Sequence, residues 1–159
     1  MNNVYDFLLQ MSNNEELLIE YNMFFKELSE LCFFVIDDYN ELKELHSVFK
    51  NIITIDNEAS IFCCTYGIDK NSDKLCIYSD NIWISTVISK EELQKIFSQY
   101  DTINNSLRGI VPSDIAILSQ EDIIGGNIKY VIYNNGAIQM YREEMMKNEF
   151  GKFVSLYWD

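Results

Sequence analysis

Basic side chains are scarce in this sequence, and histidine is nearly absent. Twelve lysines and arginines stand against 25 aspartates and glutamates, His46 is the only imidazole, and the net charge at pH 7 is −13. Affinity for phosphates comes from lysine and arginine, and an acidic surface repels polyanions. The composition therefore argues against nucleic acid and anionic membranes as direct ligands, and it favours a basic protein as the partner.

Long apolar runs are also missing, and proline and glycine are rare. No run approaches the roughly 18 apolar residues of a membrane-spanning helix, and Phe7–Leu9 is too short for a signal sequence. One proline and six glycines leave little material for a flexible linker. We therefore expect one cytoplasmic domain over residues 1–159, helix-rich and acidic over about 1–50 and sheet-rich over about 51–159.

The four cysteines lack the paired CxxC spacing of zinc sites and redox motifs. They lie instead in apolar, strand-like runs, which is typical of reduced and buried thiols. Adjacent residues such as Cys63 and Cys64 point to opposite faces of a strand, so they do not readily bind one ion. We expect no metal and no cofactor.

No residue pattern predicts catalysis. A nucleophile usually needs a base beside it, and the one histidine, at the edge of a predicted helix, is more simply a surface residue. Asp37, Asp38 and Glu41 form the densest acidic cluster, and paired carboxylates can act as acid and base. At the start of a helix, however, they are more simply a cap and a solvated turn. The sequence predicts a protein that is not an enzyme.

Several segments have apolar residues at three- and four-residue steps, which predicts amphipathic helices. Three of them follow an N-capping pattern: Ser12 with Glu15, Asp38 with Glu41, and Ser89 with Glu92. The predicted helices cover a short segment within 4–11, then about 13–30, about 39–49, and the residues after Ser89.

Short apolar runs rich in β-branched and aromatic residues predict strands. The predicted strands are 32–36, 52–55, 61–66, 75–78, 82–87, 130–133, 137–141 and 153–158. Asn135-Gly136 favours a tight type I′ hairpin turn, while residues 113–124 fit helix and strand equally well. The pattern predicts an α+β fold, in which helices, including an N-terminal helical segment, cover a mainly antiparallel sheet of hairpins.

One stretch of about twenty residues resembles a known class of protein. Tyr78–Thr86 contains a strand with Trp83, and the capped helix Ser89–Phe97 follows it. This arrangement resembles immunity proteins of bacterial polymorphic toxin and contact-dependent growth inhibition systems. The resemblance implies a small cytoplasmic protein that binds a cognate toxin, often a basic nuclease, and occludes its active site or substrate cleft.

Charge and resemblance together predict where such a partner would bind. Residues 1–60 hold twelve acids and three bases, so nine of the thirteen net negative charges lie there. Tyr39, between Asp38 and Glu41, is the expected exposed aromatic anchor. The predicted contacts are Asp37, Asp38, Tyr39, Glu41 and Glu44, followed by Glu16, Glu20, Glu27 and Asp80.

Two other interpretations remain open at this point. The chain could be a regulatory or scaffold module that forms a homo-oligomer through an aromatic sheet edge, with its charge serving solubility alone. The third interpretation is a hydrolase that uses carboxylates. The sequence leaves the identity of the toxin, the choice between active site and exosite, and the oligomeric state undecided.

Overall fold

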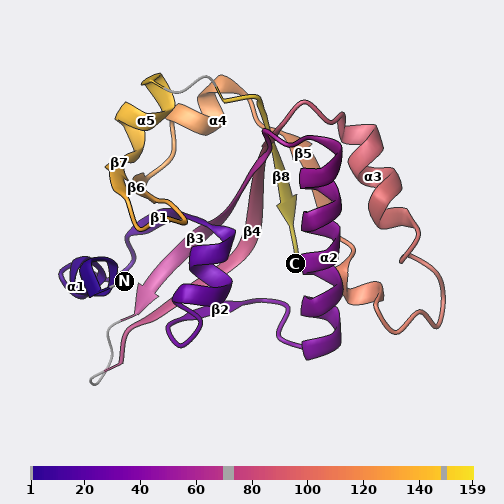
Figure 1. Ribbon diagram of the computed structural model, residues 1–159, viewed down its shortest axis with the longest axis horizontal. Coiled ribbons are helices and arrows are strands. Elements are labelled where there is room, and N and C mark those ends of the chain that lie inside the picture. The colour runs from indigo at the N-terminus through magenta and orange to yellow at the C-terminus, as the bar shows by residue number, and fades with distance from the viewer. Residues whose placement is uncertain (1, 70–73, 148–149) are drawn as a thin grey trace.

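A computed structural model describes residues 2–69, 74–147 and 150–159, and its centre is an eight-stranded sheet (Figure 1). The strands are β1 (Glu16–Glu20), β2 (Cys32–Phe34), β3 (Ser60–Asp69), β4 (Cys76–Thr86), β5 (Asp114–Ile117), β6 (Ile128–Ile132), β7 (Ile138–Met140) and β8 (Lys152–Tyr157). The helices are α1 (Asn2–Leu9), α2 (Tyr39–Ile55), α3 (Lys90–Ser98), α4 (Gln120–Ile124) and α5 (Tyr141–Lys147), with a π-helical turn η1 (Met23–Glu27) and a 3-10 turn η2 (Arg108–Ile110).

The strand order is β5-β8-β4-β3-β1-β6-β7, and β2 pairs with the first part of β4. The β1–β6 and β2–β4 pairs are parallel, whereas the other five pairs are antiparallel. The α+β fold with a mainly antiparallel sheet is therefore confirmed. No helix in the described ranges is both long and apolar enough to cross a membrane.

The strands separate two apolar cores, because successive side chains point to opposite faces of a sheet. On β3 and β4, Ile61 and Ile84 face the larger core, whereas Phe62 and Trp83 face the smaller one. Side chains from α1, η1, α2 and α3 fill the larger core. The smaller core is closed by α4 and α5, which lie together at one end of the sheet in Figure 1.

The predicted helix over 13–30 is wrong. Residues 16–20 form β1, and the helical part of the segment is limited to residues 21–27, most of it the π-helical turn η1. Because β1 lies between β3 and β6 with a core on each face, Leu17, Leu18 and Ile19 are all buried. These apolar residues and the aromatic residues that follow them occur at three- and four-residue steps, which is also the spacing of an amphipathic helix.

The predicted strand over 52–55 is also wrong, because these residues are the last turn of α2. Leu45, Phe49 and Ile52 are buried at helical spacing, so the apolar face continues past the expected end. The predicted start is confirmed, since the Asp38 carboxylate accepts a hydrogen bond from the Glu41 backbone N–H at 3.0 Å. The predicted cap of α3 is confirmed in the same way, by Ser89.

The two strands predicted over 75–78 and 82–87 are one strand, β4. The polar residues between them mark an irregularity in the pairing rather than a turn. β4 has an extra residue opposite the step from Cys64 to Thr65, and β3 then has one between Thr65 and Gly67. At this break the Thr65 hydroxyl accepts a hydrogen bond from the Leu17 N–H at 2.9 Å and donates to the Leu17 carbonyl at 3.2 Å.

The predicted hairpin near Gly136 is confirmed as β6 and β7, but its turn differs from type I′. Gly136 has φ 88°, whereas Asn135 keeps a negative φ, so only one residue is left-handed. A single left-handed glycine after a type I turn is typical of a longer hairpin loop. The ambiguous segment 113–124 divides into β5 and α4.

Candidate functional site

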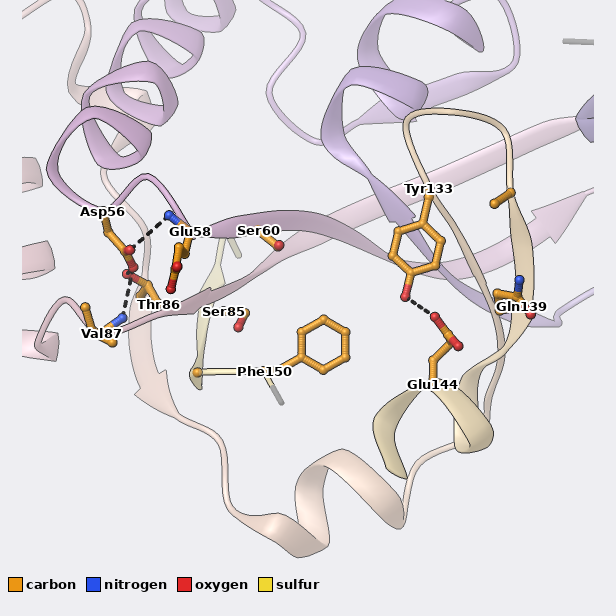
Figure 2. A pocket seen from close by; sticks show the side chains of 12 residues that line it. Asp56, Glu58, Ser60, Ser85, Thr86, Val87, Tyr133, Gln139, Glu144 and Phe150 are labelled. Atoms are coloured by element: carbon orange, nitrogen blue, oxygen red, sulfur yellow. Dashed lines mark hydrogen bonds between the residues drawn. The ribbon is translucent and has the colours of Figure 1, made fainter. Parts of the chain in front are cut away.

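A cleft of about 540 Å³ opens where the α2–β3 turn, the end of β4, the β6–β7 hairpin and the segment after α5 meet (Figure 2). Its lining includes the carboxylates of Asp56, Glu58 and Glu144. Among the cleft residues in the described part of the chain there is no lysine, arginine or histidine. The cleft is therefore an acidic recess formed by segments that lie far apart in the sequence.

Asp56 forms one side of the cleft, directly after α2. Its carboxylate accepts hydrogen bonds from the Thr86 hydroxyl at 2.7 Å, the Val87 N–H at 3.1 Å and the Glu58 N–H at 3.2 Å. These hydrogen bonds, led by that from Thr86, lower the pKa of Asp56. The group is therefore ionised at neutral pH, and it joins the α2–β3 turn to the end of β4.

Tyr133 and Glu144 form the opposite side in Figure 2, with the Phe150 ring between the two sides. The Tyr133 hydroxyl donates a hydrogen bond to Glu144 Oε1 at 2.6 Å, and Glu144 is only 9% exposed. Burial, followed by the Glu144 carboxylate, raises the pKa of Tyr133. The phenol therefore remains protonated and keeps donating to Glu144.

The cleft has the chemistry to accept a positively charged side chain. Carboxylates on both sides attract an ammonium or guanidinium group. The apolar ring of Phe150 lowers the local dielectric constant, which strengthens that attraction. The carboxylates of Asp56 and Glu144 accept hydrogen bonds from the protein, which hold them at the two sides of the cleft.

The cysteines and the histidine in the described part of the chain do not line the cleft. Burial raises the pKa of Cys32, Cys63 and Cys64, so these thiols stay protonated and react poorly. His46 packs edge-on against Phe25, and burial lowers its pKa. Within the described ranges, no three His, Cys, Asp or Glu side chains gather in the way that a metal site requires.

The predicted contacts at the start of α2 divide into exposed and engaged side chains. Asp37 and Tyr39 are exposed, the latter by 76%. Glu41 lies against Gly109, where a Cβ atom would come within 1.8 Å of its Oε2. Glu44 accepts a hydrogen bond from the Tyr100 hydroxyl at 2.6 Å. Glu41 and Glu44 therefore contact the segment that follows α3.

The remaining predicted contacts are dispersed over the molecule. Glu16 and Glu20 are half-buried on β1, and Glu20 accepts a hydrogen bond from the Asn134 N–H at 2.9 Å. Burial raises the pKa of Glu20. Glu27 is exposed on η1, and Asp80 is half-buried on β4. None of the nine predicted contacts lines the cleft.

Sequence reasoning missed the cleft for a simple reason. Asp56 and Glu58 look like an ordinary polar connection, and Glu144 lies far from them along the chain. Only the pairing of β3 with β4 and the position of α5 bring the three carboxylates to one recess.

Comparison with protein-family models, curated proteins and solved structures found no match to this chain. The charges and contacts of the chain itself are therefore the basis for assigning a function.

Proposed function

We propose that this chain is an acidic binding protein that captures a basic protein and blocks its activity. The observation that carries the proposal is the cleft with Asp56 and Glu58 on one side, Glu144 on the other, and no base among its described lining residues. A net charge of −13 would also steer a basic protein toward this surface.

In this proposal a lysine or arginine of the partner enters the cleft. Glu58 is exposed and can pair with the incoming charge at the entrance. Deeper in the cleft, Glu144 and the Tyr133 hydroxyl offer polar contacts, while the Phe150 ring can pack along the aliphatic stem. Charge would therefore provide orientation, and burial of the stem would add affinity.

The partner that fits this chemistry is a toxin with a basic substrate cleft, such as a nuclease. An acidic protein bound over such a cleft neutralises the charges that hold the nucleic acid and excludes the substrate. The likeness of Tyr78–Phe97 to immunity proteins points to the same class of partner.

The first test is a pull-down from the native host with the protein as bait, at low and then high salt, with mass spectrometry of the bound proteins. The expected result is one basic protein whose retention weakens as salt rises. If no basic protein is retained at low salt, the proposal is wrong.

The cleft is tested with Glu58→Lys and a matched reversal, Glu91→Lys, at an exposed position of α3. Both variants change the net charge equally, so a difference in their affinity for the partner shows that the position of the charge matters. We expect Glu58→Lys to weaken capture of the recovered protein about tenfold or more, because it places a repelling charge at the contact. Equal losses in the two variants would rule out the cleft as the binding site.

The start of α2 is tested in the same assay with Asp37, Asp38 and Glu41 changed together to lysine. If this variant retains the partner and its protection, these residues are not contacts. A circular dichroism melt of each variant shows whether a loss of capture comes from loss of fold.

A further inference from the structure

The sheet face that carries the smaller core is covered at only one end. In β4, every residue from Ile82 to Thr86 is buried, whereas burial alternates with partial exposure over Cys76–Ser79. Figure 1 shows α4 and α5 at one end of the sheet and the β3–β4 hairpin running away from them. Beyond these helices, large aromatic side chains reach the surface.

Four aromatic side chains from four different strands define this region, which we call the aromatic surface. They are Phe33 of β2, Tyr66 of β3, Tyr78 of β4 and Tyr157 of β8. Phe33, Tyr66 and Tyr157 are 47%, 56% and 37% exposed, and Tyr78 is half-buried. Their strands hold the rings in place, so binding costs little side-chain ordering.

The rings contact one another across the strands. Phe33 is paired in register with Tyr78, and their ring centroids are 5.8 Å apart. Tyr66 stacks on Tyr78 with centroids 6.3 Å apart and an angle of 23° between the planes. The neighbouring strand brings Tyr157 opposite Asn81. Phe33, Tyr78 and Tyr66 therefore form a continuous row of rings, and none of the four aromatic residues belongs to the larger core.

Carboxylates border the aromatic surface. Asp159 and Asp80 are close enough to Tyr157 to raise the pKa of its phenol. On the other border, Phe33, Val35 and Asp37 are exposed and alternate with buried residues, so they point to one face of the extended segment. Carboxylates therefore lie at two borders of the aromatic surface.

A guanidinium group matches this combination better than an ammonium group does. It stacks flat on an aromatic ring while its N–H groups form paired hydrogen bonds with a carboxylate. A second copy of this chain matches poorly, because it would bring together two proteins that each carry a charge of −13.

We propose that the aromatic surface binds an arginine-bearing segment of a basic protein, with the guanidinium stacked on Tyr66 or Tyr78 and paired with Asp80. This inference rests on the proposed function, since it names the partner's chemistry. It gives that partner a second contact, separate from the cleft, because none of the four aromatic residues lines the cleft.

The test uses two synthetic peptides, one alternating arginine with glycine and one alternating lysine with glycine, at equal length and charge. Binding is followed by NMR of the aromatic ring signals and by calorimetry. We expect the arginine peptide to shift the ring signals of Tyr66 and Tyr78 and to bind about threefold more tightly than the lysine peptide.

The double variant Tyr66→Ser, Tyr78→Ser should lose this preference for arginine. Tyr5→Ser is the matched control, because Tyr5 is an exposed tyrosine of α1 outside the aromatic surface, and it should keep the preference. Both variants should melt near the wild-type temperature, since the changed rings are partly or largely exposed. Asp80→Asn should also reduce the preference.

Three results would overturn the inference. Equal binding of the two peptides would show that only charge is recognised. Arginine-dependent shifts at the cleft, with Tyr66 and Tyr78 unchanged, would move the contact there and leave the proposed function intact. A concentration-dependent dimer in light scattering that Tyr78→Ser abolishes would assign the surface to a second copy. Failure of the proposed function itself would appear separately, as a host pull-down without a basic protein.

Discussion

The two halves of β4 face very different surroundings. From Ile82 to Thr86 the strand is buried on both sides, with the larger core on one face and the ring of Phe153 packed against Trp83 on the other. Over Cys76–Ser79 only one face is covered, and Tyr78 lies at the surface. One continuous strand therefore contributes stability at one end and leaves a rigid, accessible surface at the other.

The irregular register between the halves makes this division possible. Near Thr65 each of the two strands carries one extra residue, which changes the alternation of its side chains. The residues beyond this point therefore do not continue the burial pattern of the covered end. Ser79 supports the break, because its hydroxyl donates a hydrogen bond to the Cys64 carbonyl at 2.8 Å. The contrast between the halves leads to three predictions about stability.

The largest expected difference is between two aromatic residues of β3. Phe62 is 1% exposed and contacts the rings of Tyr133 and Phe153, whereas Tyr66 is 56% exposed. Phe62→Ala should lower the free energy of unfolding by about 3–5 kcal/mol, because it leaves a cavity in the smaller core. Tyr66→Ala should cost less than about 1 kcal/mol. Urea denaturation measures both, and equal losses would refute the division of the sheet.

A smaller effect is expected at the bulge itself. Thr65→Val keeps the shape of the side chain but removes the hydroxyl that bonds both backbone groups of Leu17. The free energy of unfolding should fall by about 2 kcal/mol, because these buried groups lose their partner. Thr54→Val, on the exposed side of α2, is the control and should change it by less than about 0.5 kcal/mol. If both variants unfold at the same urea concentration, the hydroxyl does not support the bulge.

The smallest effect is expected at the cleft, and it depends on pH. Asp56→Asn weakens the hydrogen bonds to Thr86 and Val87 and should cost about 1 kcal/mol at neutral pH. The folded-state pKa of Asp56 is depressed. Its contribution is therefore complete above the unfolded-state value of about 3.9 and disappears as the pH falls through the folded-state value.

The measurement for Asp56 is the difference in unfolding free energy between wild type and variant from pH 7 down to pH 2. Asp101→Asn is the control, because the Asp101 carboxylate forms an exposed ion pair with Arg108. A difference that persists unchanged at pH 2 would show that Asp56 acts through packing and not through its charge.

Local sequence patterns were sufficient for elements whose determinants lie within a few residues. The cap of Asp38, the cap of Ser89 and the hairpin around Gly136 are all present at the predicted places. Each depends on a side chain or a glycine acting on its own backbone, so the information is contained in a short window. Local patterns gave wrong secondary structure where contacts with distant segments decide it, as at β1 and at the end of α2.

The sequence by itself determined the acidic charge, the α+β class and the capped helices, because composition and short-range hydrogen bonds require no knowledge of distant neighbours. Tertiary structure alone decided that residues 16–20 join the sheet, since that depends on β3 and β6. It also brought Asp56 and Glu144 to one cleft and Phe33, Tyr66 and Tyr78 to one surface. These groups meet through strand register and helix packing, which arise only when the whole chain buries its apolar side chains together.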